Sequence, residues 1–84
     1  MKTEFAKSLS GHDRNQYYLI TKQEDNFVYL VNGTTKPLEK PKKKNRKHIQ
    51  IIKNLSDEIT EILADGITDI TVKKAIKVME KQKN

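Results

Sequence analysis

A run of six cations is the part of this sequence best suited to bind a polyanion. It consists of Lys40, Lys42, Lys43, Lys44, Arg46 and Lys47, with no acidic residue among them. A cation that meets a phosphate releases condensed counterions, so several clustered cations can supply most of a nonspecific affinity. Two prolines and flanking strand-like sequence distinguish the run from a disordered, solubilising stretch. We therefore expect it to bind phosphate groups, with His48 either a further phosphate contact or a buried donor to a backbone carbonyl.

Residues that could bind a metal ion or act as a nucleophile are few or far apart in the sequence. The chain has no cysteine and only two histidines, which lie far apart without a convincing carboxylate partner, so we expect no metal site. Its serines have no evident base to activate them. The sequence therefore predicts a protein that is not an enzyme and that uses no metal or cofactor.

The overall composition agrees with a polyanionic partner and a small core. The 84 residues are 35% apolar and 33% charged, and the net charge is +6, which favours nucleic acid as the partner. A chain of this size leaves little room for a pocket that binds a small-molecule substrate. No apolar run approaches the ~20 residues that cross a bilayer, and the first residues do not resemble a signal peptide. We expect a cytoplasmic protein without a membrane partner.

A second candidate for phosphate binding precedes the cationic run. Its residues are Gly11, His12, Asp13, Arg14 and Asn15, which form a turn-prone segment leading into a strand. Glycine and asparagine tolerate left-handed backbone conformations, so the segment can place an acid, two basic side chains and backbone amides at one tip. Such a tip can grip a sugar-phosphate backbone, although an ordinary solvated turn has the same composition.

Strand-forming residues fill much of the first half of the chain. Strands are expected at Tyr17–Thr21 and Phe27–Val31, paired through a polar turn. Asn32-Gly33 then predicts a type I′ turn into a third strand, from about Thr34 to Leu38. Pro37 and Pro41 place the lysine run at a sheet edge or in an irregular connection. Two further strands are expected at Phe5–Leu9 and His48–Ile52.

The hydrophobic period changes to a helical one after Asn54. Leu55, Ile59, Ile62 and Leu63 recur at helical spacing, with Ser56 or Asn54 as the cap. Gly66 is placed to end this helix, and Thr68 or Asp69 can cap a second one. The first helix is acidic and should face away from a nucleic acid, or pack against the lysine-bearing side. The second is rich in lysine, so it either extends the nucleic-acid footprint or is simply solvated.

The aromatic residues offer a further possibility for recognition. Those that face outward can stack on unpaired bases. Because the core is so small, most aromatic side chains should point inward. We assign Phe27 to the core and leave open whether Tyr18 and Tyr29 face the core or the solvent.

Taken together, these motifs resemble a known family. The segment Gly11-His12-Asp13-Arg14-Asn15-Gln16, then Tyr17-Tyr18-Leu19-Ile20, Asn32-Gly33 and Pro41 to His48, resembles in order and spacing the small bacterial KOW-domain RNA-binding proteins. That family is in turn similar to a large-subunit ribosomal protein of archaea and eukaryotes, and the resemblance spans roughly residues 4 to 79. Three positions depart from the family pattern: His12 replaces a basic residue, Asn15 a glycine, and Asn32 an aspartate.

The resemblance implies an α+β fold, with a small SH3-like (KOW) β-barrel followed by two C-terminal α-helices. Residues 1–53 would form the barrel with the basic segment 40–48, and residues 54–84 a two-helix extension packed on it. The implied function is binding of ribosomal or other structured RNA, in association with the ribosome or translation. The main alternative is a protein–protein interaction adaptor that uses the barrel and the charged helices. A DNA-binding helix-turn-helix ranks last, because the connection between the helices is acidic.

Overall fold

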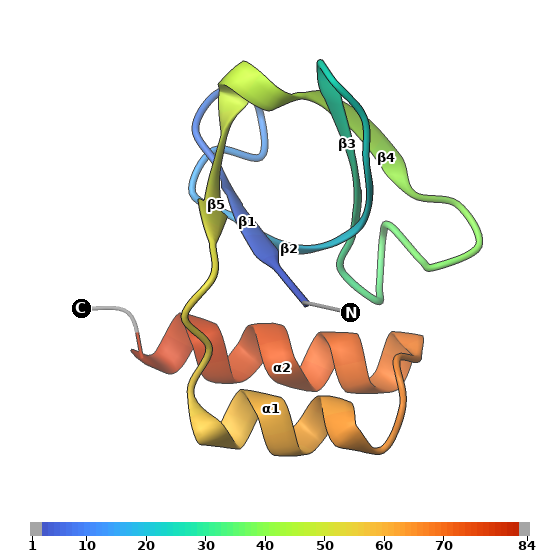
Figure 1. Cartoon of the computed structure of the whole chain (residues 1–84), viewed down its shortest axis with the longest axis vertical. Helices are drawn as coiled ribbons and strands as arrows, with labels where there is room; N and C mark the ends of the chain where they lie inside the picture. Colours follow the sequence, from blue (N-terminus) through green and yellow to red (C-terminus); the bar gives the residue numbers. More distant parts are fainter. Residues whose placement is uncertain (1–2, 83–84) are drawn as a thin grey trace.

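The computed structural model describes residues 3–82 and places five strands before two helices (Figure 1). The strands are β1 (Phe5–Ser8), β2 (Tyr17–Gln23), β3 (Phe27–Val31), β4 (Lys42–Asn45) and β5 (Ile49–Ile52). A short 3-10 helix, η1 (Arg46–His48), joins β4 to β5, and the helices are α1 (Asp57–Ala64) and α2 (Asp69–Gln82). The strands form one antiparallel sheet in the order β4-β3-β2-β1-β5. The expected α+β class with two C-terminal helices is confirmed.

The helices begin at the side-chain caps that the sequence indicates. Ser56 Oγ accepts a hydrogen bond from the Ile59 amide at 3.3 Å, which starts α1. At α2, Thr68 Oγ1 accepts from the Thr71 amide at 3.1 Å and Thr71 Oγ1 accepts from the Thr68 amide at 2.9 Å. These bonds satisfy amides that have no partner inside the helix. Gly66, with φ of 112°, follows the end of α1 as expected.

The third strand that was expected at Thr34–Leu38 is absent, and that prediction was wrong. Asn32-Gly33 does not form a type I′ turn, because that turn needs a positive φ at both residues and only Gly33 has one. The Asn32 side-chain oxygen accepts hydrogen bonds from the amides of Thr34 and Lys36, both at 2.9 Å. The segment up to Pro41 is a loop, and its Leu38 amide donates to Asp69 Oδ1 at 2.8 Å. This loop packs on the start of α2, and the next strand begins only at Lys42. The lysine run itself therefore forms the edge strand β4.

Both faces of the sheet are buried over part of their area, because successive side chains of a strand point to opposite faces. Phe5, Tyr17, Leu19 and Val31 form one apolar cluster with α1 and α2. On the other face a second cluster contains the buried residues Ala6, Tyr18, Val28, Leu30 and Ile49. We call the first face, which meets the helices, the outer face, and the second the inner face.

The helices share a core with the sheet and are not a separate unit. Ile59 of α1 and Val72, Ala75, Ile76 and Met79 of α2 pack in the same cluster as the strand residues of the outer face. The helices therefore lie together at one end of the molecule, and η1 lies at the opposite end of the sheet (Figure 1). Within residues 3–82, no helix is long and apolar enough to cross a membrane.

Candidate nucleic-acid interface

The structure brings together the two segments that the sequence nominates for phosphate binding. The Leu9 amide, just before the turn at residues 11–15, donates to the His48 carbonyl oxygen at 2.8 Å. Lys44 Nζ donates to the carbonyl oxygen of Ser10 at 3.0 Å. Segments more than thirty residues apart in the chain thus lie side by side, at the end of the sheet remote from the helices (Figure 1).

The turn at residues 11–15 is held in a defined shape. Gly11 and Asn15 have positive φ values of 88° and 72°, the conformation that was expected for Asn15. The Asn15 amide donates to the Ser8 carbonyl oxygen at 2.8 Å, which closes the turn onto the end of β1. His12 and Arg14 are exposed on this turn.

Asp13, between His12 and Arg14, points into the protein and is the centre of a buried polar network. Its Oδ1 accepts hydrogen bonds from Ser8 Oγ and Lys44 Nζ, each at 2.9 Å. Its Oδ2 accepts from the Tyr18 hydroxyl at 2.9 Å and from Lys42 Nζ at 3.0 Å. Four donors from three strands therefore converge on one carboxylate that is 8% exposed.

These contacts shift the pKa of two groups. Burial alone would raise the pKa of Asp13, but the hydrogen bonds from Lys44, Lys42, Tyr18 and Ser8 outweigh it and hold that pKa well below its ordinary value. Burial raises the pKa of the Tyr18 hydroxyl, and its hydrogen bond to the Asp13 carboxylate raises it further. Asp13 is therefore charged and Tyr18 neutral at physiological pH.

This network changes the expected role of two lysines. The sequence predicts that Lys42, Lys43 and Lys44 all bind phosphate, but alternation along β4 sends Lys42 and Lys44 to the inner face. The side chain of Lys44 is only 9% exposed, and that of Lys42 is 35% exposed. Both ammonium groups bind Asp13. Lys42 and Lys44 therefore join the turn to β4, and they do not point outward with Lys43.

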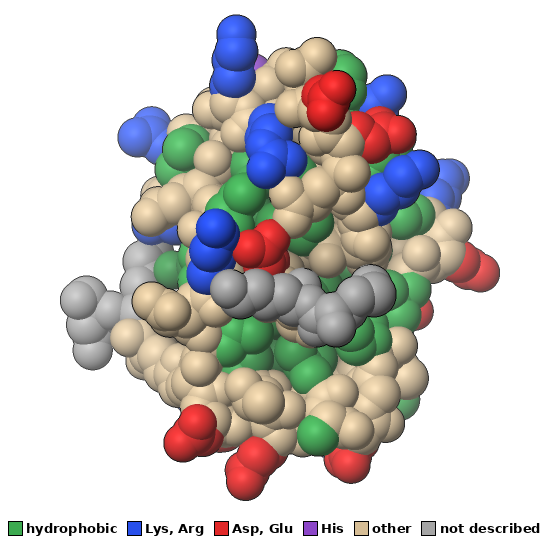
Figure 2. Space-filling view, viewed as in Figure 1, with side chains coloured by type: hydrophobic (Ala, Val, Ile, Leu, Met, Phe, Trp, Pro, Cys, Tyr) green, Lys and Arg blue, Asp and Glu red, His purple; other side chains and the backbone are tan. Residues whose placement is uncertain are grey.

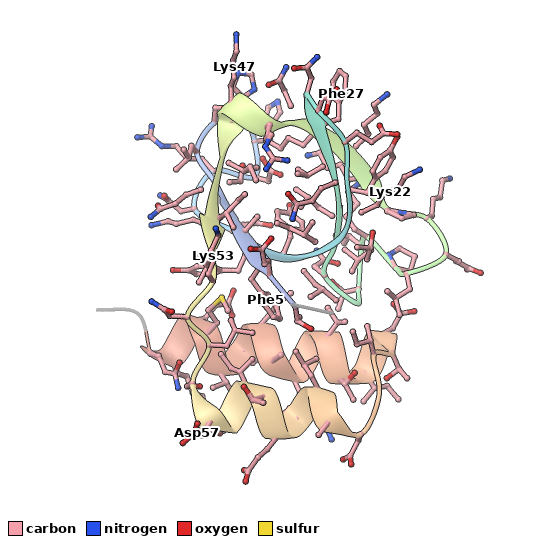
Figure 3. All side chains as sticks on the ribbon, viewed as in Figure 1. Phe5, Lys22, Phe27, Lys47, Lys53 and Asp57 are labelled. Carbon is pink, nitrogen blue, oxygen red and sulfur yellow. The ribbon has the colours of Figure 1, made fainter. Side chains whose placement is uncertain are left out.

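The outward-facing basic groups at this end come from the turn and from the end of the lysine run. Lys47 and His48 are exposed on η1, where Arg46 is half-buried and its Nη1 donates to the Glu24 carbonyl oxygen at 3.4 Å, and His12 and Arg14 are exposed on the turn. We call these five residues the basic end. Figure 3 shows Lys47 at the tip of the molecule, with Asp57 at the start of α1 on the far side. The acidic helix thus lies at the opposite end of the molecule from the basic end.

Other basic residues lie outside the basic end. Lys40 is exposed in the loop before β4, at the opposite end of that strand from η1. Lys73 and Lys77 of α2 border a cavity of about 330 Å³ whose wall includes Tyr17. On the face drawn in Figure 2, Lys and Arg side chains gather over the sheet half, with some acidic ones among them, and acidic side chains line the edge formed by α1.

Sequence reasoning missed a second surface beside the basic end. Phe27, assigned to the core, is only half-buried, and Tyr29 on the same face is half-buried too. Lys43 Nζ lies 4.3 Å from the centroid of the Phe27 ring, and Lys22 Nζ lies 5.5 Å from that of Tyr29. We call these four residues the outer aromatic patch. Its signal in the sequence was the alternation of Phe27-Val28-Tyr29-Leu30, which puts the two aromatic rings on one face and the two aliphatic side chains on the other.

Comparison of the chain with known protein families finds no match, and comparison with curated proteins finds no similar sequence. Among residues 3–82, no three histidine, aspartate or glutamate side chains are grouped so that they could hold a metal ion.

Proposed function

We propose that this protein is a non-enzymatic RNA-binding protein whose basic end holds the backbone phosphates of a structured RNA. The observation that carries the proposal is the junction of the turn at residues 11–15 with η1, which presents Arg14, Arg46 and Lys47 on one end of the sheet. Such contacts position a ligand by shape and charge, with little reading of base sequence.

The proposal includes the finer fold and the cellular setting that the motif resemblance implies. The inner cluster around Tyr18 and Leu30, the η1 link between the edge strands and the strand order are all compatible with an SH3-like barrel of the KOW type. By this resemblance the RNA would be ribosomal or otherwise structured. The protein would then act in the cytoplasm, in association with the ribosome or translation.

Rigidity supports phosphate binding at the basic end. The Asp13 network ties the turn to β4, and Asn45 Oδ1 accepts from the Lys47 amide at 2.9 Å to cap η1. The cations are therefore attached to backbone that is already ordered, so binding orders little beyond the side chains themselves. Asp13 does not compete with phosphate for these cations, because Lys42 and Lys44 already surround it.

The test is binding to a hairpin RNA over a range of salt concentrations, with paired charge reversals. Arg46→Glu/Lys47→Glu should weaken binding strongly and reduce the slope of log affinity against log salt, by about one for each phosphate that is no longer neutralised. Lys74→Glu/Lys81→Glu changes the net charge equally, on exposed positions of α2, and should have the smaller effect. The proposal fails if wild-type binding does not respond to salt, or if both double variants reduce affinity equally.

One observation favours the alternative of a protein-interaction adaptor. Ile67, in the connection between α1 and α2, and Ile70, in the first turn of α2, are 47% and 67% exposed. Exposed isoleucines beside an acidic helix can meet an apolar, basic partner surface. Affinity capture after nuclease treatment separates the two functions, because association mediated by RNA disappears while direct binding to a protein persists.

A further inference from the structure

The helices cover only part of the outer face of the sheet. Phe27, Tyr29 and Val31 alternate along β3 and point to this face. Val31 is fully buried in the cluster with α1 and α2, whereas Phe27 and Tyr29 are half-buried. The same face therefore changes along β3 from an apolar surface under the helices to aromatic rings that reach solvent beside the basic end.

An irregularity in β2 completes this surface. The pairing of β2 with β3 shifts between Ile20 and Lys22, so Lys22 pairs with Tyr29. A β-bulge of this kind changes the face to which the following side chains point. Across the other edge of β3, Lys43 pairs with Tyr29, and its ammonium group reaches over the Phe27 ring.

The lysines beside the two rings differ in their ion pairs. The Tyr29 hydroxyl donates to Glu24 Oε1 at 3.2 Å, and Lys22 Nζ lies 3.6 Å from Glu24 Oε2. A phosphate near Tyr29 would therefore meet a carboxylate. Within residues 3–82, Lys43 forms no ion pair, so Phe27 with Lys43 is the part of the patch that suits an anionic ligand carrying an aromatic group.

We propose that Phe27 stacks on an unpaired base of the bound RNA, while Lys43 and Arg46 bind the phosphates that flank this base. The inference rests on the RNA binding proposed above and adds a preference for unpaired nucleotides. An aromatic side chain stacks on any base that is free of its own duplex, whereas bases in the interior of a duplex are stacked on both faces. On binding, the Lys43 ammonium moves from the ring to the phosphate, exchanging a cation–π contact for a charge pair.

The chain path places this site next to the basic end. Phe27 pairs with Asn45, the residue before Arg46, and the Arg46 amide donates to the Asn26 carbonyl oxygen at 2.9 Å. Figure 3 shows Phe27 and Lys47 at the same end of the molecule. A single strand stacked on Phe27 can therefore continue onto the cations of η1 without crossing an acidic helix.

The experiment compares two RNAs, a blunt duplex and the same duplex with a five-nucleotide single-stranded overhang that contains 2-aminopurine. The wild type should bind the overhang RNA more tightly and quench its fluorescence. Phe27→Leu, which keeps an apolar side chain but removes the ring, should weaken binding of the overhang RNA roughly 5- to 100-fold and leave duplex binding unchanged. Phe27→Tyr should retain both properties, and Ile70→Ala, an exposed apolar position on α2, is the matched control.

The outcomes separate this inference from the function on which it depends. If the wild type binds neither RNA, RNA binding itself is wrong. If the wild type binds both RNAs but does not quench 2-aminopurine, or if folded Phe27→Leu binds the overhang RNA as the wild type does, only the stacking inference is wrong. Should circular dichroism show that Phe27→Leu is unfolded, quenching by the wild type and by Phe27→Tyr decides the question.

Discussion

Lys44 Nζ lies 2.9 Å from Asp13 Oδ1, and this contact joins the turn after β1 to the edge strand β4. It also explains how a run of lysines can form a strand at all. Neighbouring like charges repel, but alternation sends Lys42 and Lys44 inward to a shared carboxylate while Lys43 points outward. Two of the six cations in the run, Lys42 and Lys44, therefore support the fold, and the other four reach the surface.

The Asp13 carboxylate should be a large contributor to stability. Asp13→Asn keeps the volume of the side chain but leaves the Lys44 ammonium buried without a counter-charge. We expect a loss of about 3 kcal/mol in the free energy of unfolding, in the range found when a buried ion pair loses one partner. Urea denaturation followed by circular dichroism measures this loss. Asp25→Asn, in the exposed turn before β3, is the control and should stay within about 0.5 kcal/mol of the wild type.

The same carboxylate predicts a specific response to acid. A group whose pKa is lowered by folding contributes its stability above the unfolded-state pKa and loses it as the pH falls toward the folded-state pKa. The ordinary pKa of Asp13 is 3.8, and its value in the folded protein is lower. The difference in unfolding free energy between the wild type and Asp13→Asn should therefore be constant from neutral pH to about pH 5 and shrink below about pH 4. A difference that does not change down to pH 2 would contradict the network.

Lys43 and Lys44 are adjacent and chemically identical, so they form a matched pair for a third prediction. Lys44→Ala should lower the free energy of unfolding by roughly 2 kcal/mol, because it removes a buried donor from Asp13. Lys43→Ala should leave stability almost unchanged, but weaken RNA binding and reduce the salt slope by about one. Denaturation curves and salt-dependent binding on the same two proteins provide the measurement. Equal effects of both substitutions on RNA binding would restore the view that the lysine run is a single surface.

Much of the fold could be predicted from local patterns. The β2–β3 hairpin, the first strand, both helices and their caps follow from residue period and capping chemistry, which act over a few residues. The position of β4 could not be predicted. It depends on the contact of the loop that follows Asn32 with Asp69, a residue far along the chain. The inward facing of Lys42 and Lys44 likewise depends on the position of Asp13, which only the folded chain brings near.

The bulge in β2 shows the same limit at the candidate site. Uniform alternation would place Thr21 beside Tyr29, but the shifted pairing places Lys22 there. Phe27 was assigned to the core because a large aromatic side chain is usually buried in a small protein. Its partial exposure follows from where the helices stop covering the sheet. That boundary is set by tertiary packing, whereas alternation along β3 indicates only that the two rings share a face.

The docking of the loop after β3 leads to a fourth prediction, at Gly33. This residue has φ of 81°, and a Cβ atom there would collide with the Asp69 carbonyl oxygen and lie 3.0 Å from the Lys73 amide nitrogen. Gly33→Ala should therefore lower the free energy of unfolding by roughly 3 kcal/mol, because left-handed strain and overpacking add. Gly66→Ala is the control, since Gly66 also has a positive φ but no atom lies within 4 Å of its added Cβ. It should lose only the strain contribution, roughly 1 kcal/mol. Equal losses in urea denaturation would mean that the loop does not pack on α2, and the explanation for the late start of β4 would have to be abandoned.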